Sequence, residues 1–162
     1  MTTMKQQYFS KSYRRLYQSR GAARGVAKGV ARGGRRPIGL LGGSFNPPHA
    51  GHVWLSRRVA REYRLAAVWW LVIDSNPLKP DADLPPVAVR AAAARRLVGR
   101  GLIKIKPIDG HHPLWHYSYY LLRDLLRRHR GQRFVFIMGS DCLFQLHHWH
   151  RWRDLVRLLP LV

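Results

Sequence analysis

The sequence predicts an α/β fold in which a parallel sheet carries helices on both faces. Short apolar runs alternate along the chain with segments whose apolar residues recur every three or four positions. Gly, Pro, Asn or Asp bounds each apolar run. Such alternation is typical of βαβ units with right-handed crossovers. We therefore expect the C-terminal ends of the strands to share one edge, where ligands of open α/β sheets bind.

The expected elements follow one another from Pro37 onward. Four strands are predicted over residues 38–41, 68–73, 102–105 and 134–138. Helices between them are predicted over residues 53–63, 87–100 and 117–130. The segment 74–86 is rich in Pro and Asp, leaves the end of the second strand, and is predicted to be a substrate loop.

Composition indicates one basic domain. The chain has 162 residues, a formal net charge of +21 and a pI near 11.6, which suits nucleic acid, phosphorylated metabolites or anionic lipid as partners. No uninterrupted apolar run approaches the roughly 20 residues that a bilayer requires, so we expect no membrane span. Cys142 is the only cysteine, which excludes an internal disulfide and a multi-cysteine metal site. We expect a reducing, cytoplasmic location.

Residues 1–36 differ from the rest of the chain. They carry many Lys and Arg, no Asp or Glu, and a Gly, Ala and Arg repeat with few large apolar groups. We expect a disordered basic extension before a domain over residues 37–162. An organelle transit peptide, an RNA-binding arm and an over-extended gene start fit this composition equally. An RNA-binding arm would give the protein a weak, salt-sensitive nucleic-acid contact.

The stretch "IGLLGGSFNPPHAGH" combines features of a phosphate site. Gly42 and Gly43 end the first predicted strand and let backbone N–H groups approach a ligand closely. His49 and His52 are three residues apart at the start of a helix, beside the unpaired N–H groups of its first turn. Gly51 between them leaves access for a ligand. We therefore predict an anion site in which two imidazoles follow charge as it moves to a leaving oxygen.

This chemistry suits phosphoryl or nucleotidyl transfer by positioning and electrostatics. "GGSFNPPHAGH" resembles the G-x-F-x-P-x-H-x-G-H signature of the nucleotidyltransferase superfamily, which contains adenylyltransferases and class I aminoacyl-tRNA synthetases. Three further stretches, "VWWLVIDSNPLKP", "FVFIMGSDCLFQLHHWHRWRDL" and "HYSYYLL", resemble bacterial nicotinate-nucleotide adenylyltransferases. The resemblance implies a Rossmann-like fold and transfer of AMP from ATP to nicotinate mononucleotide, giving nicotinate adenine dinucleotide and pyrophosphate in NAD biosynthesis.

The resemblance also implies residue roles. His49 and His52 would be catalytic. The ATP-binding residues would be Gly42, Gly43, Ser44, Phe45, His49, Gly51, His52, Gly139 and Asp141. The residues binding nicotinate mononucleotide would be Asn46, Lys79, Tyr117, Ser118 and Trp149. Taken alone, Lys79 is equally a solvated loop lysine, Asp141 an N-cap and Trp149 a core residue.

The resemblance implies Mg²⁺ bound through the phosphates of ATP, and the sequence shows no dedicated metal ligands. A metal site made by the histidines of "HHWH" and "HHPLWH" is disfavoured, because no cysteine or carboxylate cluster completes a coordination set.

Two departures from the family affect these expectations. Ser118 can replace the first hydroxyl of the family's Tyr-Thr-x-x-Thr-Leu motif, whereas Leu121 cannot replace the second, which should weaken recognition of the pyridine carboxylate. The chain also stops at "RLLPLV", before a Ser/Thr-x-x-Ile-Arg motif that binds ATP phosphates, and Val162 resembles the start of a strand. We therefore expect a domain truncated at its C-terminus: a fragment, a shortened gene product or a protein that has lost part of its ATP site.

Two other functions stay open. One is adenylyl or cytidylyl transfer to another phosphorylated acceptor, such as phosphopantetheine, against which the tryptophan-rich "HHWHRWRDL" argues. The other is a non-catalytic nucleotide- or RNA-binding relative that uses the basic extension. The sequence makes no prediction of the oligomeric state.

Overall fold

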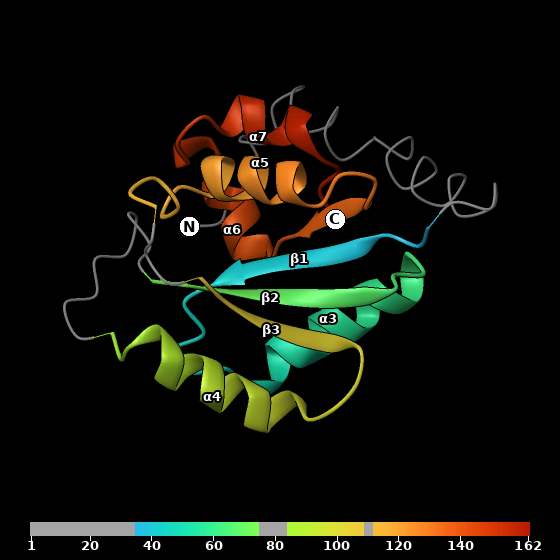
Figure 1. The fold of residues 1–162 in the computed structure, drawn as a ribbon, viewed down its shortest axis with the longest axis vertical. Helices are drawn as coiled ribbons and strands as arrows, with labels where there is room; N and C mark the ends of the chain where they lie inside the picture. Colours follow the sequence, from blue (N-terminus) through green and yellow to red (C-terminus); the bar gives the residue numbers. More distant parts are fainter. Residues whose placement is uncertain (1–34, 75–83, 109–111) are drawn as a thin grey trace, which may run out of the picture.

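A parallel sheet forms the centre of the molecule (Figure 1). The computed structural model describes residues 35–74, 84–108 and 112–162. Within these ranges the sheet has four strands: β1 (Ile38–Gly43), β2 (Ala67–Ile73), β3 (Ile103–Ile108) and β4 (Phe134–Ile137). Their spatial order is β3-β2-β1-β4, so β1 lies between β2 and β4.

All the strand pairings are parallel, which brings the C-terminal ends of the strands to one edge. Leu40 of β1 is opposite Trp69 of β2 and Phe136 of β4. The residues of β4 are all buried, as expected for a strand covered on both faces. Leu161, near the end of the chain, forms an isolated parallel bridge with Phe136.

Helices cover both faces of the sheet (Figure 1). One face carries α3 (Ala50–Glu62) and α4 (Val87–Val98). The other face carries α5 (Ser118–Arg128), α6 (Ser140–Gln145), the 3₁₀ turn η1 (Leu146–His148) and α7 (Trp152–Leu158).

Each layer of helices has its own apolar core. Trp70 and Val68 of β2 are fully buried against α3 and α4. Leu40 of β1 is fully buried on the opposite face with Leu122 of α5 and Leu155 of α7. Burying each such side chain contributes on the order of 2 kcal/mol, so the strand positions are fixed by both layers.

The structure confirms the predicted fold class and the four strands. Several boundaries differ. Strand β3 runs three residues past the predicted end at residue 105, and β1 runs two residues past residue 41. Helices α4 and α5 each end two residues early, and α3 begins at Ala50 instead of residue 53. Helix α3 starts early because His49 takes an extended backbone conformation (φ −142°, ψ 170°) and serves as the N-cap residue. No separate bounds were predicted for the short helices after β4.

Two predictions fall largely outside the described residues. These are the basic extension over 1–36, of which only residues 35 and 36 are described, and the substrate loop with Lys79, of which residues 75–83 are not described. In the described ranges, no helix is long and apolar enough to cross a bilayer.

Candidate active site

A cavity of about 520 Å³ opens at the edge where the strands end. One wall is the turn from β1 to α3, and the opposite wall comes from the start of α5 and the segment around η1. Leu71, Ile73 and Phe136 line the cavity between these walls. The predicted ligand edge is therefore the edge that carries a cavity.

His49 and His52, the histidine pair, lie together on the first wall. Their ring centroids are 3.8 Å apart with an interplanar angle of 37°. The backbone N–H of His49 donates a hydrogen bond to Nδ1 of His52 at 3.3 Å. Both residues line the cavity at the start of α3, where backbone N–H groups of the first turn have no partner within the helix. The structure thus brings the predicted pair together at a helix N-terminus that suits an anion.

Contacts that lead from the core to the histidine pair hold His52 in place. The Ser56 hydroxyl donates to the backbone oxygen of His52 at 2.8 Å, and Trp70 Nε1–H donates to the Ser56 oxygen at 2.8 Å. The ring of Phe45 stacks on Trp70 with centroids 4.6 Å apart and lies 4.9 Å from the His52 ring. Because Ser56 and Trp70 are fully buried, the position of His52 is set by the core beneath it.

These contacts also determine the protonation of His52. Burial lowers the pKa of His52 below its usual value, and the neighbouring His49 lowers it further, while Asp141 opposes the shift. His52 is therefore neutral near pH 7. Since Nδ1 accepts a hydrogen bond, the proton of the neutral ring lies on Nε2. The ring thus provides an N–H donor without carrying a full charge.

The glycine-rich turn lies beside the pair. Gly42, Gly43 and Ser44, which were predicted to bind ATP, line the cavity, as does Asn46, which was predicted to bind nicotinate mononucleotide. Phe45 lines it too, but its side chain is 2% exposed, and its φ of 50° lies in the left-handed region. The Phe45 ring therefore packs under the histidine pair, and only its backbone suits the predicted ATP contact.

Two predicted glycines do not line the cavity. Gly51 is exposed, and a Cβ there would lie 3.0 Å from Nδ1 and Cε1 of His49, so this glycine leaves room for the His49 ring. Gly139 is the N-cap residue of α6, where a Cβ would lie 2.5 Å from Oδ1 of Asp141. Each glycine thus leaves room for a side chain that lines the cavity, His49 beside Gly51 and Asp141 beside Gly139.

Asp141 lines the cavity but is not the N-cap residue of α6. It lies in the first turn of that helix, after Ser140, where a carboxylate interacts favourably with the helix dipole. The prediction that Asp141 is an N-cap is therefore wrong, because the N-cap residue of α6 is Gly139, two residues earlier.

Arg90 supports the turn from beneath and was not predicted. It is 3% exposed, and its guanidinium donates to the backbone oxygens of Ser44, Ile73 (2.8 Å) and Pro85 (2.6 Å). One cation thus joins the turn after β1, the end of β2 and the segment before α4. An arginine in a helix rich in arginine gives no sequence signal that it is buried.

The opposite wall contains three of the five residues predicted to bind the acceptor. Tyr117, Ser118 and Trp149 line the cavity, and the Trp149 ring lies edge-on to Phe136 at 6.3 Å. His150 packs against Tyr117 with ring centroids 4.5 Å apart, and its Nε2 lies 3.4 Å from the Tyr120 hydroxyl. Leu121, which is buried, also lines the cavity at the place where the family motif has its second hydroxyl.

Three further histidines, His116, His148 and His150, line this wall, and none was predicted as a site residue. Their only sequence signal was their proximity to Tyr117 and Trp149. In the described part of the chain, no group of three or more His, Cys, Asp or Glu side chains could hold a metal ion. His111 of the disfavoured metal cluster lies outside the described residues.

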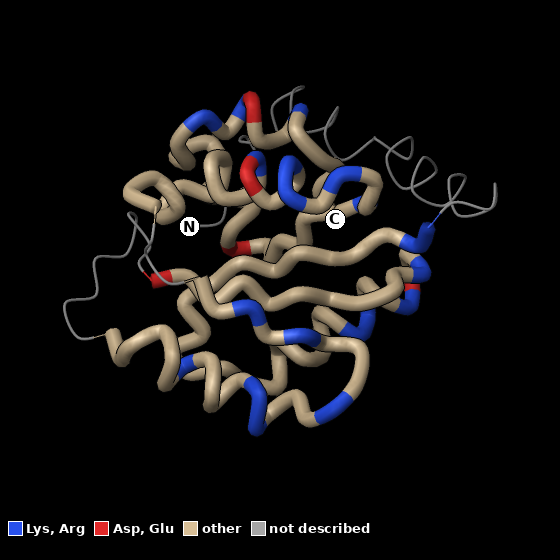
Figure 2. The backbone as a smooth tube through the Cα atoms, viewed as in Figure 1, with Lys and Arg blue, Asp and Glu red and all other residues tan. Residues whose placement is uncertain are grey.

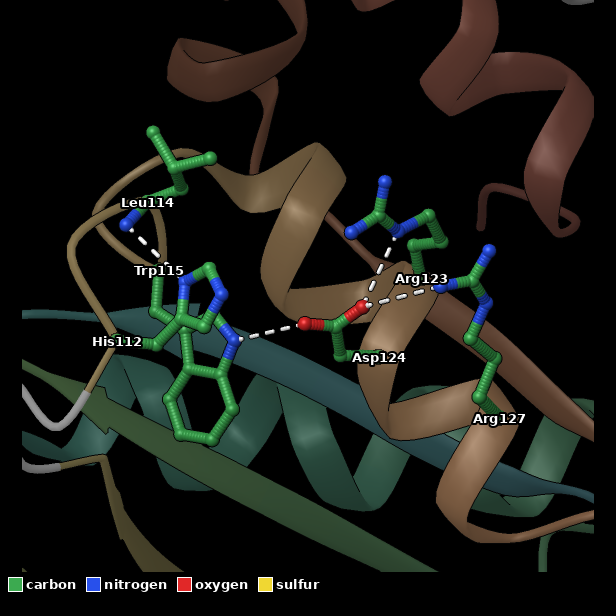
Figure 3. Close-up of polar contacts among 6 residues, drawn as sticks. All are labelled: His112, Leu114, Trp115, Arg123, Asp124 and Arg127. Carbon is green, nitrogen blue, oxygen red and sulfur yellow. Dashed lines mark hydrogen bonds and ion pairs between the residues drawn. The ribbon is translucent and has the colours of Figure 1, made fainter.

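The turn that leads into this wall is anchored to α5 by Asp124 (Figure 3). Trp115 Nε1–H donates to Asp124 Oδ2 at 3.2 Å, and Arg123 Nε donates to Oδ1 at 3.1 Å. Arg127 lies 4.0 Å from the same oxygen. Burial raises the pKa of Asp124, but the hydrogen bonds from Trp115 and Arg123 outweigh it and hold the pKa below its usual value. Asp124 therefore fixes the turn immediately before His116 and Tyr117.

Known proteins match both the sequence and the fold. A family model described as cytidylyltransferase-like matches residues 40–162. A Cereibacter sphaeroides protein named "Probable nicotinate-nucleotide adenylyltransferase" is 43% identical over 124 residues, which are 76% of this chain and 66% of that protein. A Gluconobacter oxydans protein of the same name is 44% identical over 124 residues, 76% of this chain and 63% of its own length. The chain thus spans slightly less than two thirds of these relatives.

Two solved structures of Plasmodium falciparum nicotinic acid mononucleotide adenylyltransferase share the fold. The complex with NaAD has a TM-score of 0.64 at 20% identity and covers 75% of this chain and 60% of its own. The complex with APC has a TM-score of 0.60 at 16% identity, and the match covers 79% of this chain and 74% of the Plasmodium chain. At these identities the likeness concerns the fold alone. Because the family model matches well over half of the sequence, the chain belongs to the cytidylyltransferase-like family.

Proposed function

We propose that this domain transfers AMP from ATP to nicotinate mononucleotide and releases pyrophosphate, forming nicotinate adenine dinucleotide. The observation that carries the proposal is the histidine pair at the start of α3, facing a cavity whose other wall holds Trp149. Relatives at 43–44% identity bear the name of this activity. The sequence resemblance led to the same reaction.

The reaction needs no covalent enzyme intermediate. A 5′-phosphate oxygen of nicotinate mononucleotide attacks the α-phosphorus of ATP in line, while the bond from that phosphorus to the bridging oxygen breaks and pyrophosphate leaves. Negative charge moves toward the leaving oxygens. The Nε2–H of His52, the ring of His49 and the first N–H groups of α3 are donors placed to follow that charge.

The rest of the wall that holds the histidine pair suits ATP. The backbone of Gly42, Gly43 and Ser44 would lie against the nucleotide, and Asp141 across the cavity would face the adenosine. Arg90 keeps this backbone in position through its bonds to Ser44 and Ile73. The turn is therefore organised before substrate arrives, which reduces the entropy lost on binding.

The opposite wall suits the acceptor. An indole such as that of Trp149 stacks well on an electron-poor pyridine ring, contributing on the order of 1 kcal/mol beyond burial. The hydroxyls of Tyr117 and Ser118, the amide of Asn46 and the ammonium of Lys79 are the proposed polar contacts. Because Leu121 provides no hydroxyl, we propose weak discrimination between the acid and amide mononucleotides.

Mg²⁺ is the proposed cofactor, held by the phosphates of ATP. The residues fit this arrangement, since Asp141 is the one carboxylate among the described residues that line the cavity. When bound, the ion would neutralise phosphate charge and polarise the transferred group.

We also propose that the protein acts in the cytoplasm, where ATP is available and a lone cysteine stays reduced. The basic extension over residues 1–36 is proposed to add a weak nucleic-acid contact through its arginines.

The test is a product assay with ATP, Mg²⁺ and a panel of acceptor phosphates. We expect nicotinate adenine dinucleotide and pyrophosphate in equal amounts with nicotinate mononucleotide. Turnover only with another acceptor, such as phosphopantetheine, would assign the domain to a different transferase. Nucleotide binding without turnover of any acceptor would make it a non-catalytic relative and contradict the proposal.

A further inference from the structure

Arginines recur at equivalent places between helices and strands. Arg64, Arg100 and Arg130 each lie two residues after the end of a helix, α3, α4 and α5 respectively. Each precedes the strand that follows, β2, β3 or β4. Arg35 holds the corresponding place before β1, three residues ahead of Ile38 as Arg64 is three residues ahead of Ala67. Since Ile38 pairs with Ala67, the positions of Arg35 and Arg64 match in register.

The parallel sheet gathers these four residues, the arginine edge, at the end opposite the cavity. In the order β3-β2-β1-β4 the edge reads Arg100, Arg64, Arg35 and Arg130. Adjacent strands lie about 4.8 Å apart, so a row across four strands spans about 14 Å. Figure 2 shows Lys and Arg collected at the right-hand end of the sheet, where β1 begins and α3 ends, with little Asp or Glu among them.

Internal contacts do not account for this charge. All four arginines are exposed, and none takes part in the ion pairs found among the described residues. Glu62 lies close to Arg64 in the chain, but its carboxylate pairs with Arg58 at 3.5 Å.

The helix dipole explains only part of it. Cations in the last turn of a helix are favourable, and each of these helices already has them there: Arg61 in α3, Arg95 and Arg96 in α4, and Arg127 and Arg128 in α5. The arginine edge lies beyond those last turns, where the dipole effect fades. Its charge is therefore additional to what the helices need.

We propose that the arginine edge binds the phosphate backbone of single-stranded nucleic acid, at a surface separate from the cavity and without a need for residues 1–34 of the basic extension. A single row of guanidinium groups matches one chain of phosphates, and arginine favours phosphate through paired N–H donors. The cavity described above lies at the other end of the sheet, and contacts to phosphate alone carry no base information, so binding at the arginine edge is expected to be independent of sequence and strongly salt-dependent.

An anionic membrane fits this edge less well than a nucleic acid does. Membrane-surface binding usually adds apolar side chains that enter the lipid. Of the large apolar side chains exposed in the described ranges, only Leu97 lies in the last turn of a helix that ends at this edge.

The experiment compares three triple variants of the full chain, each of which removes three positive charges. The edge variant is Arg64→Gln, Arg100→Gln and Arg130→Gln. The control variant is Arg57→Gln on α3 with Arg153→Gln and Arg157→Gln on α7, all exposed and outside the edge, and the extension variant is Arg20→Gln, Arg24→Gln and Arg32→Gln. Arg36 stays unchanged, because its guanidinium donates to the backbone oxygens of Arg64 (2.9 Å) and Leu65 (2.8 Å). Thermal unfolding of each variant verifies that it folds.

Fluorescence anisotropy of labelled oligouridylate and oligothymidylate is measured over a range of salt concentrations. We expect the edge variant to bind at least about tenfold more weakly than the control variant. Each phosphate contact on a single strand contributes roughly 0.7 to the slope of log affinity against log salt. Loss of three contacts should therefore make the slope of the edge variant smaller by about two. Tighter binding of one oligomer would indicate whether the partner is RNA or DNA. Either result supports the proposal, because both oligomers present the same phosphate backbone.

Three results would overturn the proposal. Equal weakening in the edge and control variants would show a dependence on total charge, and weakening in the extension variant alone would place the contact in residues 1–34. Equal affinity for vesicles of phosphatidylserine or for polyglutamate would show that nucleic acid is not the preferred partner. Adenylyl transfer should be unchanged in the edge variant, so failure of this proposal and failure of the proposed function are separate results.

Discussion

The backbone N–H of His49 donates to Nδ1 of His52 at 3.3 Å, and this one hydrogen bond determines which nitrogen of His52 is free to donate. With Nδ1 occupied, the neutral ring carries its proton on Nε2. The sequence spacing places both imidazoles near each other. The extended backbone of His49 at the start of α3 is what directs its N–H toward Nδ1 of His52.

Replacing His52 tests that donor. His52→Ala should lower adenylyl transfer by about 10²- to 10³-fold, the usual cost of removing one donor to developing charge. His52→Gln should lose less than His52→Asn, because the glutamine nitrogen reaches as far as Nε2 and the asparagine nitrogen does not. The measurement is kcat with saturating ATP, and His147→Ala, at an exposed position that does not line the cavity, is the control. Activity of the alanine variant within a few-fold of wild type would remove His52 from the mechanism.

The lowered pKa of His52 predicts a pH-dependent stability. Above the unfolded value of 6.5, the ring is neutral in both states and contributes no penalty. As pH falls below 6.5, the unfolded chain binds a proton before the folded chain does, so the free energy of unfolding decreases. We expect wild type to lose stability relative to His52→Gln over this range, measured by urea denaturation at a series of pH values. Parallel pH dependences for the two proteins would contradict the shift.

Trp149 should affect the acceptor more than ATP. Trp149→Ala removes the proposed stacking surface and should raise KM for nicotinate mononucleotide by roughly tenfold or more, while Trp149→Phe should restore part of the binding. Trp54→Ala is the matched control, because Trp54 on α3 is 67% exposed and does not line the cavity. Steady-state kinetics with each substrate varied in turn separates the two effects. An equal rise in KM for ATP would mean that Trp149 supports the whole cavity.

Asp124 is a positioning residue for the same wall, since it holds Trp115 and the turn before Tyr117. Asp124→Asn should cost roughly 1–3 kcal/mol of stability through weaker bonds to Trp115 and Arg123. Its functional effect should be a higher KM for the acceptor with a smaller change in kcat. The control is Glu62→Gln, which breaks an exposed pair with Arg58 and should leave the stability and the KM for the acceptor nearly unchanged.

The carboxylate of Asp124 also predicts an acid-sensitive term. Its folded pKa is held below the usual 3.8, so its contribution to stability is full above that value and is lost as pH falls through the lowered pKa. Asp124→Asn should therefore flatten the stability profile at acid pH. An unchanged profile would show that the carboxylate is not ionised in its bonds to Trp115 and Arg123.

Arg90 should be the most sensitive structural residue of the site. Arg90→Met leaves the backbone oxygens of Ser44, Ile73 and Pro85 without their buried donor, at a cost of about 1–3 kcal/mol for each unsatisfied group. We expect a large fall in melting temperature and, in the folded fraction, weaker ATP binding. Arg95→Met, on the exposed side of the same helix, should have little effect on either. A melting temperature within about 2 °C of wild type would contradict the assigned role.

Sequence patterns predicted the sheet well because β1, β2 and β4 are largely buried and appear as apolar runs between turn residues. They also identified the histidine pair, since its spacing and the glycines before it are local features. The strand order, the clamp made by Arg90 and the anchoring of Trp115 by Asp124 depend on contacts between distant segments, which periodicity does not encode. The short helices after β4 lack a long periodic pattern, so Trp149 could be singled out only through the resemblance.

The most direct test of the central claim is histidine ¹⁵N NMR of the full chain, titrated with a non-hydrolysable ATP analogue and Mg²⁺. Bound triphosphate should shift the ring resonances of His49 and His52, raise the pKa of His52, and leave His129 and His147 unchanged. Saturable binding of the analogue with no change at either member of the histidine pair would contradict the assignment of that pair to the triphosphate.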